Sequence, residues 1–149
     1  MSHRKIKEGK KVDEIQIVVF ALGEELYAIP ISNVKEIINS TKVTAVPKAG
    51  DHVQGIINLR GKIVTIVNLA SKLGFVSNVQ KTIDGRVIIV ESNDLIMGFE
   101  VDGVSEVMKI SVEEIEPPPD ITLQDKFLTG VAKVNGKLLL LLNVEALVS

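Results

Sequence analysis

Short apolar runs separated by polar turns extend along the whole chain, and this pattern is typical of β-strands. The runs are four to six residues long and rich in Val, Ile, Leu and Phe, and the clearest lie at residues 17–22, 87–90 and 138–142. Helical turns fit only three short segments, residues 32–38, 68–73 and 143–148. We therefore predict an all-β protein with a few short helical turns, arranged as small barrels or as a sandwich.

The order of these elements occurs twice. IVVFALGEELYAIPISNVKEII (17–38) aligns without a gap with VIIVESNDLIMGFEVDGVSEVM (87–108), at an offset of 70, and eleven of the 22 pairs are apolar in both copies. GIINLRGKIVTIVNL (55–69) aligns with GVAKVNGKLLLLLNV (130–144) at an offset of 75. Each copy alone is too small to bury a large core. We therefore expect one domain, starting near residue 13, of two intertwined barrel subdomains at about 13–80 and 81–149.

Comparison of the last hairpin turn in the two copies distinguishes residues that the fold requires from a residue that can have another role. Gly61 and Gly136 are identical and suit a turn position with positive φ, so we interpret them as structural. Arg60 aligns with Asn135, the residue type that a tight turn prefers. A left-handed conformation would cost arginine about 1–2 kcal/mol, whereas a type II turn would avoid this cost. In either turn the fold does not require Arg60, which is a solvated surface charge or an anchor for a partner protein.

Two asparagines are also identical between the copies. Asn68 and Asn143 each end an apolar run, directly before a predicted helical turn. A side-chain oxygen at that position accepts a hydrogen bond from a free backbone N–H of the first turn. We interpret both residues as helix caps.

Apolar residues beside two acidic positions of the repeat have two interpretations. Val34 lies two residues before Glu36, and Val107 follows Glu106 directly. These apolar side chains either belong to the core or line an apolar groove between the two barrels.

The composition narrows the class of function. The 149 residues are 46% apolar and 24% charged, with a net charge of −2 and no cysteine, so disulfides and thiolate catalysis are excluded. The two histidines have no Ser/His/Asp partners, and no glycine-rich phosphate loop is present. Aromatic residues make up 3%, too few for stacking single-stranded nucleic acid. We expect no catalytic residue, no metal, no cofactor and no nucleic-acid partner.

The N-terminus begins MSHRKIKEGKK and is polar and basic. It lacks the apolar core of a signal peptide, and no run in the chain approaches the roughly 18 apolar residues of a membrane helix. We expect a disordered basic arm over residues 1–12 and a cytoplasmic protein that does not insert into a membrane.

Several of these segments together resemble the CheW family of bacterial chemotaxis coupling proteins. GIINLRGKIVTIVNLASKLG (55–74) looks like the family's hallmark segment. VVFALGEELYAIPISNVKEII (18–38), VDGVSEVMKIS (101–111) and FLTGVAKVNGKLLLLLNVEAL (127–147) are also similar to family segments, in the family's order. The resemblance covers residues 14–148. Thr65 stands where the family often has proline, and Asn68 where aspartate is also common.

This resemblance implies a fold and a role. The fold would be two five-stranded SH3-like β-barrels around a shared hydrophobic core. The role would be that of an adaptor, not an enzyme, which couples transmembrane chemoreceptors to the histidine kinase CheA in receptor arrays at the inner face of the membrane. One surface would dock the kinase regulatory domain, and a groove between the barrels would take the receptor's cytoplasmic tip. The same domain also occurs fused to kinases or receivers, and a length of 149 residues favours the free-standing adaptor.

The resemblance also implies which residues face the receptor. Carried onto this chain, they are Val34, Glu36, Arg60 and Val107. Arg60 is the residue that the comparison of the two turns had already singled out. A small-ligand-binding β-barrel is the alternative function, and it would need a closed apolar pocket with convergent polar groups.

Overall fold

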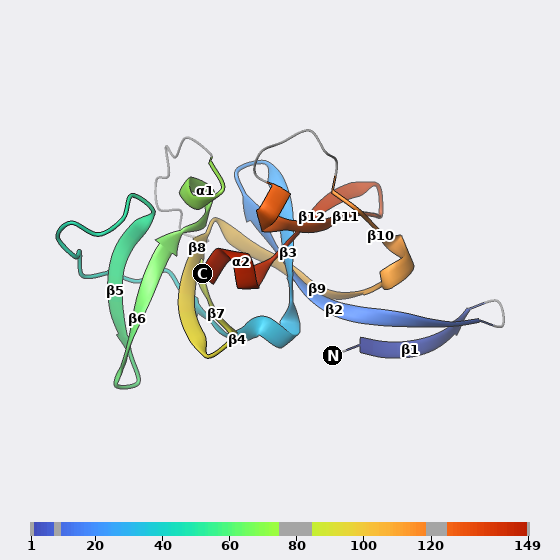
Figure 1. Ribbon diagram of the computed structural model, residues 1–149, viewed down its shortest axis with the longest axis horizontal. Helices are drawn as coiled ribbons and strands as arrows, with labels where there is room; N and C mark the ends of the chain where they lie inside the picture. The colour runs from blue at the N-terminus through green and yellow to red at the C-terminus, as the bar shows by residue number, and fades with distance from the viewer. Residues whose placement is uncertain (1, 8–9, 75–84, 119–124, 149) are drawn as a thin grey trace.

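The computed structural model describes residues 2–7, 10–74, 85–118 and 125–148 and consists of two β-sheets with a few short helices (Figure 1). The two sheets lie next to each other, and the helices α1 and α2 lie between them in Figure 1. The all-β prediction is confirmed, and the arrangement fits two SH3-like barrels.

The larger sheet, called barrel A, has the strand order β1-β2-β3-β12-β11-β10, with β9 paired to β2 as well. Its strands are β1 (Ser2–Lys7), β2 (Lys10–Leu22), β3 (Glu25–Pro30), β9 (Gly103–Ser111), β10 (Ile115–Glu116), β11 (Leu128–Val134) and β12 (Lys137–Leu142). The second sheet, called barrel B, has the order β4-β7-β8-β6-β5. Its strands are β4 (Val34–Asn39), β5 (Val53–Leu59), β6 (Lys62–Asn68), β7 (Arg86–Ser92) and β8 (Leu95–Val101).

Each barrel is built from both copies of the repeat, because the copies exchange their first hairpins. The β2–β3 hairpin of the first copy pairs with β9 and β12 of the second copy. The β7–β8 hairpin of the second copy pairs with β4 and β6 of the first copy. The registers agree: Val19 pairs with Glu106 in barrel A, and Ile89 pairs with Glu36 in barrel B. Val19 corresponds to Ile89 and Glu36 to Glu106, at the offset of 70 found in the sequence.

This exchange corrects the predicted subdomain boundaries. Residues 13–80 and 81–149 are the two copies of the repeat, but neither range is a barrel by itself, since each barrel takes strands from both ranges. The error has a physical reason. An internal alignment shows which segments are equivalent, but it does not show whether a hairpin pairs within its own copy or with the other one.

A shared core joins the barrels, as the resemblance implied. The largest apolar cluster takes buried side chains from both sheets and both helices, among them Phe20, Leu69, Phe99, Leu142 and Leu147. Two smaller clusters fill the separate barrels, one around Ile17 and Val19 in barrel A, the other around Val64 and Ile89 in barrel B. The shared cluster therefore holds the two barrels together.

The helices are short: η1 (Ile31–Asn33), α1 (Leu69–Lys72), η2 (Val112–Glu114), η3 (Asp125–Phe127) and α2 (Val144–Val148). Both predicted caps are confirmed. Asn68 Oδ1 accepts a hydrogen bond from the Ser71 N–H at 3.0 Å, and Asn143 Oδ1 accepts one from the Ala146 N–H at 3.2 Å. These caps satisfy backbone donors at the start of α1 and α2.

Two predicted segments differ in the structure. The helical turn expected over 32–38 ends at Asn33, and Val34–Asn39 is strand β4, because pairing with the apolar strand β7 outweighs the local helical pattern. The disordered arm expected over 1–12 is also not as predicted, since Ser2–Lys7 forms β1 and pairs antiparallel with β2. A basic composition indicates charge, but it does not show whether the backbone finds a hydrogen-bonding partner.

No helix in the described ranges is long and apolar enough to cross a membrane.

The glycine shared by the two copies at the start of the last hairpin is explained by a close approach of neighbouring backbone. A Cβ on Gly55 would overlap the Thr44 carbonyl oxygen, and Gly55 has φ +153°. At the equivalent Gly130, a Cβ would lie 2.9 Å from the Glu116 carbonyl oxygen. The hydrogen bonds between Thr44 and Ile56 hold the neighbouring backbone of barrel B in place.

We expect Gly55→Ala to lower the free energy of unfolding by about 2–4 kcal/mol, because backbone must move to admit the methyl group. Gly61→Ala is the matched control: Gly61 has φ +84° but open space around it. It should cost only about 1–2 kcal/mol. Urea unfolding of both variants measures the difference. Equal losses would show that the close approach at Gly55 does not constrain the fold.

Candidate functional site

The turn between β5 and β6 holds Arg60 in a left-handed conformation. Arg60 has φ +52° and Gly61 has φ +84°, while the equivalent Asn135 and Gly136 have φ +51° and +76°. Of the two turn geometries considered from the sequence, the one that is unfavourable for arginine is therefore present. Asn58 Oδ1 accepts a hydrogen bond from the Gly61 N–H at 2.9 Å and helps to close this turn.

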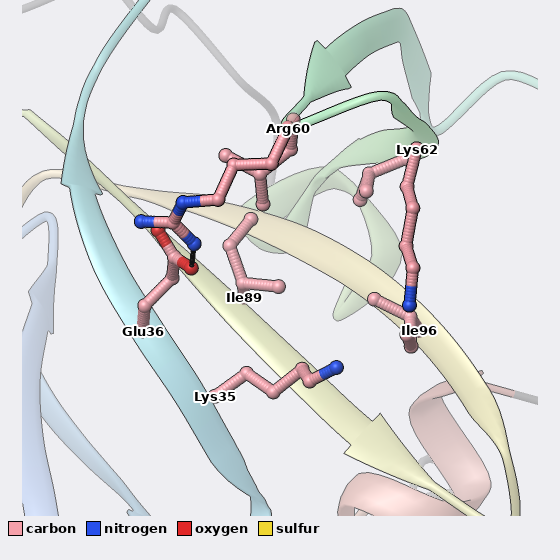
Figure 2. Close-up of a pocket in the computed structure, with 8 residues that line it drawn as sticks. Lys35, Glu36, Arg60, Lys62, Ile89 and Ile96 are labelled. Carbon is pink, nitrogen blue, oxygen red and sulfur yellow. Dashed lines mark hydrogen bonds and ion pairs between the residues drawn. The ribbon is translucent and has the colours of Figure 1, made fainter.

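From this turn the Arg60 side chain reaches across to β4 and forms an ion pair with Glu36 (Figure 2). The Arg60 side chain is 76% exposed and that of Glu36 is 24% exposed, so the guanidinium remains open to solvent on its other side. In barrel A the equivalent residues are Asn135 and Glu106, and Glu106 forms no ion pair within the described part of the chain. The pair is therefore a feature of barrel B alone.

The ion pair borders a hollow at the β5–β6 turn end of barrel B, which we call the barrel B hollow. Its volume is about 230 Å³. The polar lining residues are Lys35, Glu36, Arg60 and Lys62. The apolar lining residues are Leu59, Val64, Ile89 and Ile96. Figure 2 shows Ile89 and Ile96 among these charged side chains. The arrangement is an apolar floor with a charged rim.

Barrel A has a hollow at the corresponding place, which we call the barrel A hollow. Its volume is about 170 Å³. Its lining residues are Val19, Leu26, Ser105, Glu106, Met108, Val134, Asn135, Lys137 and Leu139. Every lining residue of the barrel B hollow has its counterpart here, at an offset of 70 or 75. The hollow is thus a property of the fold, whereas its rim differs between the barrels.

Val34 and Val107 occupy the strand faces that turn to the shared core, whereas Glu36 occupies the face that turns to the interior of barrel B. Val34 pairs with Val90, and Val107 pairs with Val18; the partners of both belong to the shared core. Val34 is half-buried against this core, while Val107 is 49% exposed. Glu36 instead pairs with Ile89, which lies inside barrel B. The structure therefore brings Glu36 and Arg60 together, with Val34 on the same strand but facing the shared core.

Two charged residues of the rim were not found from the sequence. Lys35 Nζ lies 3.4 Å from Glu91 Oε2, and Lys62 begins β6 directly after the turn. Lys35 differs between the two copies of the repeat, because its counterpart is Ser105, and this difference could have identified it. The bulge in β4 that brings Lys35 to the rim is visible only in the structure.

The hollows do not favour the alternative of a small-ligand-binding barrel. The barrel A and barrel B hollows are smaller than the roughly 300–1,000 Å³ of small-molecule pockets. A third hollow, of about 480 Å³, lies beside the segment that follows β4, but exposed polar residues such as Thr41, Lys42 and Thr44 border it. Among the described residues, these hollows include no closed apolar pocket. The barrel B hollow has room for a single large side chain of a partner.

Comparisons with known proteins agree on one family. The CheW-like domain matches residues 16–149. A chemotaxis protein CheW of Helicobacter pylori is 35% identical over 140 residues, covering 93% of this chain and 84% of the relative. One of Klebsiella aerogenes is 36% identical over 138 residues, covering 90% and 81%. The crystal structure of the scaffolding protein TtCheW from Thermoanaerobacter tengcongensis superposes with a TM-score of 0.82 at 38% identity, covering 87% of this chain and 88% of that one.

These relatives are named as chemotaxis and scaffolding proteins and not as enzymes, in agreement with the prediction of a non-enzymatic role.

We expect Arg60→Asn to change the free energy of unfolding by no more than about 1 kcal/mol. Asparagine tolerates the left-handed conformation better than arginine does, and the exposed ion pair that is lost contributes at most about 1 kcal/mol. Glu36→Gln is the control, because it breaks the same ion pair and leaves the turn unchanged. Urea unfolding tests both variants. A loss of more than about 2 kcal/mol for Arg60→Asn would mean that the ion pair supports the fold.

Proposed function

This chain belongs to the CheW-like domain family, and on that premise we propose that it couples transmembrane chemoreceptors to the histidine kinase CheA. In this proposal the chain is an adaptor that binds the cytoplasmic tip of a methyl-accepting chemotaxis protein and the regulatory domain of the kinase. It works in the cytoplasm, in receptor arrays at the inner face of the membrane, and neither inserts into the membrane nor carries a cofactor.

The observation that supports a partner-binding role is the Arg60–Glu36 ion pair. Arginine in a left-handed turn costs about 1–2 kcal/mol, and an exposed ion pair returns at most about 1 kcal/mol. Folding alone therefore gives no reason for arginine here, and the equivalent turn of barrel A does without it. An exposed, oriented guanidinium with several remaining N–H donors is suited to a polar contact with another protein.

The receptor-facing surface in this proposal extends from the ion pair along β4 to the shared-core side of the molecule. Glu36 and Arg60 supply the oriented charges. Val34 and the half-exposed Val107 supply apolar contact area on the other side of β4 and on β9. Because the two groups lie on different sides, a partner that contacts all four residues must wrap around β4. A helical hairpin tip has two helices and a bend with which to do so.

The kinase contact requires a separate surface, since the adaptor must hold both partners at once. Each interface need only be weak, because a receptor, a kinase and many adaptors in one array reinforce one another through their high effective concentration. Substitutions on the receptor-facing surface should therefore separate the two binding activities.

We expect Arg60→Asn to lose most of its binding to a cognate receptor cytoplasmic fragment and to keep its binding to cognate CheA. Co-sedimentation of the native and variant chains with each partner measures this. Lys137→Asn is the matched control, because it removes a cation beside the equivalent turn of barrel A, and it should bind both partners normally. If Arg60→Asn binds the receptor like the native chain, Arg60 is not a receptor contact. If the native chain binds neither partner, the adaptor function itself is wrong.

A further inference from the structure

We propose that the barrel B hollow is a socket for an acidic segment of the receptor, in which one apolar side chain enters the hollow and a neighbouring carboxylate pairs with Lys62 and Lys35. This inference rests on the proposed function and adds the chemistry of the partner and two specificity-determining residues to it.

The floor of the barrel B hollow is apolar and rigid. Val64 is 3% exposed and Ile89 is fully buried, so the floor is the outer layer of the barrel B core, fixed in place by packing. Leu59 and Ile96 pack against the same cluster and form the sides. A preformed apolar depression of about 230 Å³ matches one large apolar side chain. Buried anchors of this kind often dominate the binding energy of a protein interface.

The rim of the barrel B hollow carries more positive than negative charge. The residues that line the barrel B hollow carry three positive charges and one negative charge, which gives a net charge of +2. Arg60 is paired with Glu36, and Lys35 with Glu91 at 3.4 Å. Lys62 forms no ion pair among the described residues and has an exposed side chain. In Figure 2 the side chains of Lys35 and Lys62 extend into the view from different strands. An incoming carboxylate would meet an excess of positive charge.

The barrel A hollow shows that this excess is not required by the fold. Its floor is apolar in the same way, and it carries Lys137 and Glu106, which correspond to Lys62 and Glu36. Ser105 stands in place of Lys35, and Asn135 in place of Arg60, so the lining residues have a net charge of zero. The two hollows share a shape and differ in charge, as expected if only the barrel B hollow selects an acidic partner.

The acidic character of the proposed receptor segment also predicts how its binding depends on salt. An exposed cation attracts a carboxylate over about 10 Å at moderate ionic strength, and added salt weakens this attraction. The apolar contact is much less sensitive to salt. Charge-reversed variants should therefore differ from the native chain mainly at low ionic strength.

The experiment compares the affinity of the full chain for a cognate receptor cytoplasmic fragment at low and high ionic strength. We expect Lys62→Glu to bind roughly five- to twentyfold more weakly at low salt, with a smaller difference at high salt. Lys35→Ser, which introduces the barrel A residue, should also weaken binding, but by a smaller factor than Lys62→Glu. Lys137→Glu is the matched control and should bind like the native chain. All three positions are exposed or at the rim, and urea unfolding verifies that each variant is folded.

A second measurement identifies the partner's carboxylate directly. Carbodiimide activates a carboxylate and joins it to a lysine amine only when the two are in contact. In the complex of the native chain with the receptor fragment, we expect a cross-link from Lys62 or Lys35 to a Glu or Asp that lies beside an apolar residue.

Three outcomes separate the two proposals. Weaker binding of Lys62→Glu at low salt, together with this cross-link, supports the socket. Native-like binding of Lys62→Glu while Arg60→Asn loses the receptor overturns the socket and leaves the adaptor function standing. A native chain that does not bind the receptor fragment overturns both.

Discussion

The exchange of the first hairpin between the two copies of the repeat is the constraint on which the rest of the structure depends. It places β3 beside β12 and β8 beside β6 as parallel pairs, with the same register in both barrels. Parallel neighbours need a long connection between them. Between β3 and β12 the chain passes through the strands of barrel B, whereas between β6 and β8 it passes through α1 and then β7 of the same barrel. The shared core forms as a result, because each exchanged hairpin turns one face to its barrel and the other to the junction.

The candidate site depends on the same exchange. Lys35, Glu36 and Arg60 come from the first copy, whereas Ile89 and Ile96 come from the hairpin that the second copy contributes. Neither copy could form this hollow by itself. The packed floor also gives the rim a rigid base, since Ile89 and Val64 are buried inside barrel B. The surrounding core can therefore hold an unfavourable backbone conformation at Arg60 without loss of the fold.

The features that recur in both copies, and the residues that differ between the copies, could be predicted from the sequence. Asn68 and Asn143 were recognised as caps, and Arg60 stood out against Asn135. Features that depend on which segments pair were not predictable. β4 was expected to be helical because the apolar spacing of Val34–Asn39 fits both the helical and the strand periodicity. Pairing with β7 decides in favour of a strand. Lys35 was missed because a β-bulge, not a residue pattern, turns it toward the rim.

The ion pair between Glu36 and Arg60 links folding with binding at this site. Glu36 occupies one edge of the guanidinium and fixes its direction, so a partner would not have to order a free arginine side chain. Arginine has five N–H donors in a planar fork, and those that Glu36 does not use remain available. The acidic residue is present in both barrels, at Glu36 and Glu106, but only barrel B combines it with an arginine. A single difference between two equivalent turns is thus enough to give one barrel a directed cation and to leave the other barrel without one.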